Sequence, residues 1–89
     1  MLFMVVERFR RGAAPVYERA AEHGRMLPPG VTYVDSWVEE GLERCFQLME
    51  AEDRGALDQW IARWRDLVDF EVVPVIGSAE AKARALGGA

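Results

Sequence analysis

The stretch VTYVDSWVEEGLERCFQLME, residues 31–50, decides the fold, because it predicts two β-strands joined by a tight turn. Side chains alternate between the two faces of a strand, so Tyr33, Asp35 and Trp37 would share one face. The opposite face of the same strand carries two valines and a serine. Neither face has the uniformly polar composition of a solvent-exposed surface, so we expect both sides of this hairpin to be covered.

The length of the turn decides which residues of the second strand share that face. A three-residue loop, residues 39–41, would place Gly41 in the left-handed conformation that such loops favour. In this register one face carries Tyr33, Asp35, Trp37, Cys45 and Gln47. A two-residue turn would instead group the first three of them with Arg44, Phe46 and Leu48. We prefer the three-residue loop and keep the second register as the alternative.

The first part of the chain predicts a strand and a helix. Residues 1–7, MLFMVVE, form a continuous apolar run that is typical of a central strand covered on both faces. Pro15 is well placed as the first residue of a helix, where its missing N–H costs nothing. This helix would extend to about Gly24 or Arg25, with the glycine as a C-terminal stop.

A second, stronger helix signal follows the hairpin. Asp53 is a good N-cap, and apolar residues recur after it with helical spacing. They are Leu57, Trp60, Ile61, Trp64, Leu67 and Val68. We therefore predict a helix over residues 54–68.

The C-terminal part predicts a fourth strand and a short helix. Residues 70–76, FEVVPVI, suit an edge strand, because Pro74 has no N–H for a ladder hydrogen bond. Residues 78–86 would form a short helix that is stopped by Gly87 and Gly88.

The order β-α-β-β-α-β, followed by one more helix, indicates an α+β fold of the ferredoxin-like kind. This fold implies a four-stranded antiparallel sheet of order 4-1-3-2 with two helices on one face. We divide the chain into a ferredoxin-like domain, residues 1–77, and a C-terminal helix and tail, residues 78–89. The strands are apolar on both faces while the helices cover one, so we expect a homodimer formed through the open sheet face.

Composition supports a dimer and excludes several classes of protein. The chain has 89 residues and is 51% hydrophobic, whereas a domain of this size buries only about 60% of its unfolded surface. Its 11 basic residues are dispersed among 15 acidic ones, which argues against nucleic-acid binding. No apolar run approaches the ~18 residues of a membrane span. The single cysteine excludes an internal disulfide and favours a cytoplasmic protein.

The sequence lacks the motifs that hold common cofactors and metal ions. It contains no Gly-rich phosphate loop, CxxC pair, HExxH motif or nucleophile elbow. Its one histidine, His23, and its one cysteine, Cys45, are too few and too far apart in the sequence for a metal site. We therefore expect no cofactor and no metal ion.

Three segments resemble a small bacterial family of uncharacterised proteins of the DUF3303 type. They are MLFMVVERF at the start, GRMLPPGVTYVDSWVEEGLERCFQLMEAED in the middle and WIARWRDLVDFEVVPV near the end, so the resemblance covers residues 1–77. That family is similar in layout to the dimeric α/β-barrel superfamily, in which two ferredoxin-like domains pair their sheets. The resemblance implies this dimer. It does not imply one activity, because the superfamily includes cofactor-free monooxygenases, isomerases, haem-degrading enzymes and effector-binding domains.

The candidate binding site follows from the preferred hairpin register. Its residues are Tyr33, Asp35, Trp37, Cys45 and Gln47, on the sheet face that a partner would cover. They would line a pocket between two sheets, with aromatic walls and a few polar groups that orient a small ligand. The alternative is a hydrogen-bonded dimer interface in which Asp35 pairs with an arginine.

Catalytic candidates are weaker. Asp35, His23 and Glu7 are the side chains that could transfer a proton, Glu7 because it ends the predicted central strand and would be an acid or base if buried. For the haem-degrading members of the superfamily, the resemblance would imply a set of His, Trp and Asn residues. This sequence has no Asn, so the resemblance to those members fails in part. Cys45 is expected to be a buried, unreactive thiol.

We therefore expect a small homodimer that binds a small molecule between its sheets. One alternative is a cofactor-free enzyme of the monooxygenase or isomerase type. The other is a dimer with a purely structural or interaction role.

Overall fold

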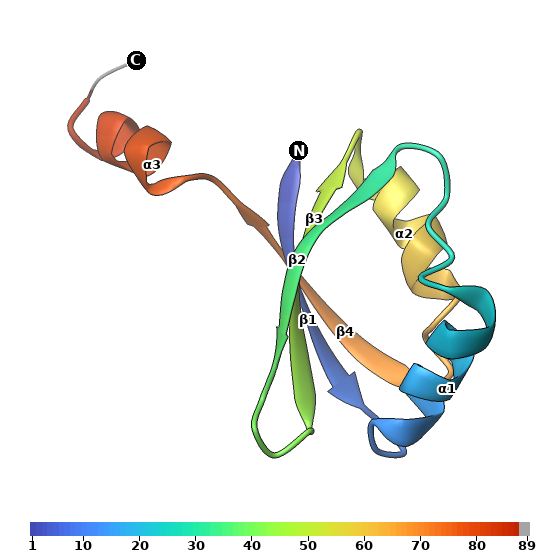
Figure 1. Ribbon diagram of the computed structural model, residues 1–89. Helices are drawn as coiled ribbons and strands as arrows, with labels where there is room; N and C mark the ends of the chain where they lie inside the picture. Colours follow the sequence, from blue (N-terminus) through green and yellow to red (C-terminus); the bar gives the residue numbers. More distant parts are fainter. Residues whose placement is uncertain (88–89) are drawn as a thin grey trace.

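The computed structural model describes residues 1–87, which form a four-stranded antiparallel sheet and three helices (Figure 1). In chain order the elements are β1 (Leu2–Phe9), α1 (Ala14–His23), β2 (Val31–Val38), β3 (Arg44–Ala51), α2 (Arg54–Ala62), β4 (Val68–Val75) and α3 (Ser78–Ala85). The sheet order is β2-β3-β1-β4, which is 4-1-3-2 when it is counted from the β4 edge. Helices α1 and α2 lie on the same side of the sheet (Figure 1).

The core lies between α2 and the sheet. Phe3, Val5 and Met49 from the two central strands pack with Leu57 and Trp60 of α2, and each of the five is at most 2% exposed. Burying a side chain of this size contributes about 1.5–3 kcal/mol. Helix α2, with three buried residues, is therefore the helix that packs most closely on the sheet, whereas α1 has none.

Helix α2 begins as the sequence predicts and ends earlier. The Asp53 side chain accepts a hydrogen bond from the backbone N–H of Ala56 at 2.8 Å, which caps the helix. The predicted helix over residues 54–68 is nevertheless wrong in its second half, because residues 63–67 form turns. Val68 already begins β4, where it pairs with Phe9 of β1. Strand pairing therefore overrides the helical spacing at this point.

The hairpin corrects the preferred register. The pairing of β2 with β3 shifts between Tyr33, which faces Met49, and Asp35, which faces Leu48. This β-bulge adds one residue to β2, so the alternation of side chains reverses there. Tyr33 stays on the helix-covered face, whereas Asp35 and Trp37 lie on the open face.

The hairpin loop also differs from both predicted turns. Its hydrogen bonds run from the Glu39 N–H to the Arg44 carbonyl at 2.9 Å and from the Leu42 N–H to the Glu39 carbonyl at 2.8 Å. The left-handed position is held by Leu42, with φ of 59°, and not by Gly41. The loop is therefore longer than the three residues predicted.

Within residues 1–87, one face of the sheet has no helix over it (Figure 1). We define the open face by the apolar side chains that point away from the helices: Leu2, Met4, Val6, Trp37, Phe46, Leu48, Val73 and Val75. Trp37 is 52% exposed and Val73 is 40% exposed. The strands therefore carry apolar side chains on both faces, as the sequence predicts.

Helix α3 extends away from the rest of the domain at the end of β4 (Figure 1). It has no buried residue. Gly87 adopts φ of 75°, as expected of a helix stop, whereas Gly88 lies outside the described residues. In the part of the chain that the structure describes, no helix is long and apolar enough to span a membrane.

Candidate functional site

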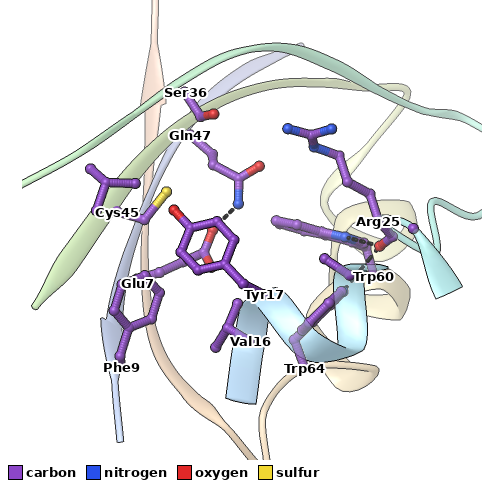
Figure 2. Close-up of a pocket in the computed structure, with 13 residues that line it drawn as sticks. Glu7, Phe9, Val16, Tyr17, Arg25, Ser36, Cys45, Gln47, Trp60 and Trp64 are labelled. Atoms are coloured by element: carbon purple, nitrogen blue, oxygen red, sulfur yellow. Dashed lines mark hydrogen bonds between the residues drawn. The ribbon is translucent and has the colours of Figure 1, made fainter. Parts of the chain in front are cut away.

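A cavity of about 290 Å³ lies between α1 and the helix-covered face of the sheet (Figure 2). It exists because α1 packs loosely: this helix has no buried residue, and it presents small side chains such as Val16 and Ala20 to the sheet. We call this cavity the helix–sheet pocket. Its walls are formed by Glu7, Phe9, Val16, Tyr17, Ala20, Gly24, Arg25, Ser36, Val38, Cys45, Gln47, Trp60 and Trp64.

Glu7 is the buried charge-bearing group of the pocket. Its side chain projects from β1 toward the helices, and the residue is only 4% exposed. Burial raises the pKa of Glu7 from 4.5 to about 7, against the opposing effects of a hydrogen bond from Gln47 and the charge of Arg25. A carboxyl with this pKa is present in both its neutral and its charged form near neutral pH.

Gln47 is the partner of Glu7 and retains an unused acceptor. Its Nε2 donates a hydrogen bond to Oε2 of Glu7, across the paired strands β1 and β3 (Figure 2). Its Oε1 is buried and has no hydrogen-bond partner among residues 1–87. An unpaired buried polar atom costs about 1–3 kcal/mol. The wall of the pocket therefore holds a buried acceptor that lacks a hydrogen bond within residues 1–87.

Cys45 lies opposite Glu7 on the neighbouring strand, and its thiol is expected to be unreactive. Burial and the nearby charge of Glu7 raise the pKa of the Cys45 thiol to about 12. A nucleophilic cysteine needs a lowered pKa, because the thiolate is the reactive form. Cys45 is therefore a small neutral group in the wall of the pocket, and its burial is as the sequence predicts.

Two tryptophans fix the rim of the pocket. The indole N–H groups of Trp60 and Trp64 both donate to the backbone carbonyl of Arg25, at 2.9 and 3.0 Å (Figure 2). The guanidinium of Arg25 lies over the ring of Tyr33, 3.5 Å from the ring centroid. These contacts tie the segment after α1 to α2 and to the sheet. They also occupy the polar atoms of both indoles, so the rings act as apolar walls.

The five-residue site predicted from the hairpin is not one surface. Cys45 and Gln47 line the helix–sheet pocket, and the hydroxyl of Tyr33 on the same face hydrogen-bonds to Oγ of Ser36 at 2.7 Å. Asp35 and Trp37 lie on the open face beyond the bulge. The prediction that these five residues share a face is therefore wrong, because the bulge reverses the alternation after Tyr33.

The three weaker catalytic candidates, His23, Asp35 and Glu7, do not lie together in the structure. The side chain of His23 is 60% exposed at the end of α1, where its Nε2 lies 3.6 Å from the carboxylate of Glu22. Asp35 accepts a hydrogen bond from the N–H of Ser36 at 2.8 Å and does not line the helix–sheet pocket. Of the three candidates, Glu7 alone lines this pocket.

Sequence reasoning missed the contribution of α1 to the site. Tyr17 and Ala20 line the pocket from this helix, and Arg25 follows its end. The available signal was the weak amphipathicity of α1, whose small residues leave room against the sheet. Across residues 1–87, no three His, Cys, Asp or Glu side chains are placed to hold a metal ion together.

The comparison with known proteins gives a family and no activity. The model of one family, described as "Domain of unknown function (DUF3303)", matches residues 1–88. No curated protein and no solved structure matches the chain. Because the family model covers nearly the whole sequence, the chain belongs to the DUF3303 family.

Proposed function

We propose that this protein binds a small molecule in the helix–sheet pocket. The observation that carries the proposal is the hydrogen-bonded pair of the buried Glu7 and the partly buried Gln47, in a cavity with otherwise mainly apolar walls. Buried polar atoms in proteins are nearly always hydrogen-bonded, and the Oε1 atom of Gln47 is not. A ligand that completes this hydrogen bonding would gain affinity and orientation together.

The pocket lies on the helix-covered face of the sheet, so the proposed ligand site and the proposed dimer interface are on opposite faces. We propose that the dimer forms through the open face, where two sheets would pack about 10 Å apart. The half-exposed Trp37 and the other apolar side chains of that face support this arrangement. Each subunit would then carry its own complete pocket.

A cofactor-free isomerase is the second candidate function. Its support is Glu7, whose pKa of about 7 suits a group that both accepts and returns a proton near neutral pH. In such a reaction the carboxylate would take a proton from one carbon of the ligand, the electron pair would shift, and the proton would return to another atom. Neither an oxidant nor a metal ion is needed for this step. A monooxygenase reaction draws no comparable support from the pocket.

Binding is tested by ¹H–¹⁵N NMR of the full chain during a screen of small fragments. We expect shifts concentrated on pocket residues such as Val16, Ala20 and Gln47. The variant Val38→Phe narrows the pocket from β2 and should abolish these shifts, whereas Val38→Ile should retain them. Fragments that perturb only the open face, or binding that survives Val38→Phe unchanged, would contradict the proposal.

The isomerase alternative needs a different measurement. A fragment found to bind is incubated with the protein in D₂O, and deuterium incorporation at its carbon atoms is followed by NMR. Proton transfer by Glu7 predicts incorporation that Glu7→Gln abolishes while binding persists. Binding without incorporation leaves the protein as a binding module.

A further inference from the structure

The polar atoms of the helix–sheet pocket are not equally available to a ligand. The indole N–H groups of Trp60 and Trp64 are occupied by the carbonyl of Arg25. Oγ of Ser36 is paired with the hydroxyl of Tyr33. Among residues 1–87, the buried side-chain atom that remains without a partner is Oε1 of Gln47, which is an acceptor.

Glu7 fixes the orientation of this acceptor. Because Nε2 of Gln47 donates to the Glu7 carboxylate, the oxygen of the same amide is turned away from Glu7 (Figure 2). Gln47 lies on β3 in the middle of the sheet, opposite Val5 of β1, so its backbone is held in place by strand pairing on both sides. The acceptor is therefore preorganised and does not need to be reoriented when a ligand binds.

Size and charge restrict the ligand further. A cavity of about 290 Å³ is at the lower end of the ~300–1,000 Å³ of typical ligand pockets, which suits a body of one ring. The rings of Trp60 and Trp64, with Val16 and Val38, make the walls apolar. Glu7 and Arg25 both line the pocket and carry opposite charges, so neither an anion nor a cation would regain from them the hydration that it loses on entry.

We propose that the pocket selects a small neutral molecule with a flat apolar ring and one hydroxyl or N–H group that donates to Oε1 of Gln47. This inference rests on the proposed binding function and adds the chemical class of the ligand. Gln47 is the residue that determines specificity, and Glu7 is a positioning residue for it. Shape alone would accept a ring without a donor, so the hydrogen bond carries the discrimination.

Four one-ring probes test the ligand class by NMR titration of the full chain. Phenol supplies a neutral donor, anisole lacks the donor, benzoate is an anion and benzylamine is a cation. We expect phenol to bind about five- to tenfold more tightly than anisole, because one net hydrogen bond separates them. Benzoate and benzylamine should both bind more weakly than phenol.

A pair of variants assigns this preference to Gln47. Gln47→Met keeps a similar side-chain volume and removes the acceptor, so phenol and anisole should bind it equally. Gln59→Met makes the same change on the exposed surface of α2 and should retain the preference. The comparison of phenol with anisole in the unsubstituted protein stands by itself if Gln47→Met does not fold.

The outcomes separate the two levels of the proposal. Equal binding of phenol and anisole in the pocket, or tightest binding of benzoate or benzylamine, overturns the ligand class and leaves the binding pocket intact. If none of the four probes shifts pocket resonances, and no fragment in the screen binds the pocket, both the ligand class and the proposed function are contradicted.

Discussion

At the scale of single residues, Glu7 is the buried acidic group of the candidate site. Its place at the end of an apolar strand marks it in the sequence as an acid or base that depends on burial, and the fold buries it. The sequence does not reveal its neighbours. Gln47 is brought to it by the pairing of β1 with β3, and the charge of Arg25 comes from the segment after α1.

Stability should depend on pH through Glu7. Because its pKa is raised from 4.5 in the unfolded chain to about 7 in the folded protein, the folded state binds the extra proton in this range. The free energy of unfolding should therefore fall as pH rises from about 5 to 7 and level off above it, by up to about 3 kcal/mol. Urea unfolding at a fixed protein concentration measures this slope.

Glu7→Gln should remove this pH dependence and make the protein more stable at pH 8, because the amide is never charged. Glu40→Gln, at an exposed position in the hairpin loop, is the matched control and should keep the slope. Arg19 lowers the pKa of Asp66, so below about pH 5 the free energy of unfolding gains a pH dependence of the opposite sign. The two variants should therefore be compared above pH 5. Equal slopes for the protein and Glu7→Gln would contradict the burial of this carboxyl.

At the scale of elements, the sequence predicts types well and local irregularities poorly. Alternation identifies β2 and β3, but it carries no sign of the bulge after Tyr33, which depends on how two strands fit each other. Helical spacing identifies α2, but Trp64 lies in the turns after this helix and Val68 lies in β4, where both are nevertheless buried. Such features are decided by tertiary packing, which local patterns do not contain.

The hairpin loop offers a test at this scale. Leu42 adopts φ of 59° and is 55% exposed, so its side chain gains little burial in return for a strained backbone. Leu42→Gly should therefore raise the free energy of unfolding, by up to about 1 kcal/mol. Leu42→Ala retains the strain and should give no such gain. A loss of stability in Leu42→Gly would contradict the left-handed assignment of this residue.

At the scale of the whole molecule, the two faces of the sheet have different roles. The helix-covered face contains the core under α2 and the pocket under α1, because α1 presents small residues where α2 presents large ones. The open face has apolar side chains and no cover within residues 1–87. The two-faced strands were predictable from the sequence. The side of the sheet that holds the pocket was not, because it depends on the bulge and on the loose packing of one helix.

The proposed dimer is tested by placing a charge in the middle of the open face. Leu48→Glu should give a monomer by analytical ultracentrifugation at concentrations where the unsubstituted protein is a dimer, because buried unpaired charges are costly. Ala62→Glu adds the same charge at an exposed position at the end of α2 and should leave the dimer intact. A monomeric unsubstituted protein, or a dimer that both variants retain, would rule out this interface.

The orientation of Gln47 and the proposed ligand class both depend on the burial of Glu7 in the helix–sheet pocket. The decisive measurement is the titration of its side-chain carboxyl carbon by ¹³C NMR, with Glu7→Gln to assign the signal. We predict a midpoint of about 7. A midpoint near the ordinary value of 4.5 would mean that Glu7 is exposed to water and that the helix–sheet pocket does not form as described.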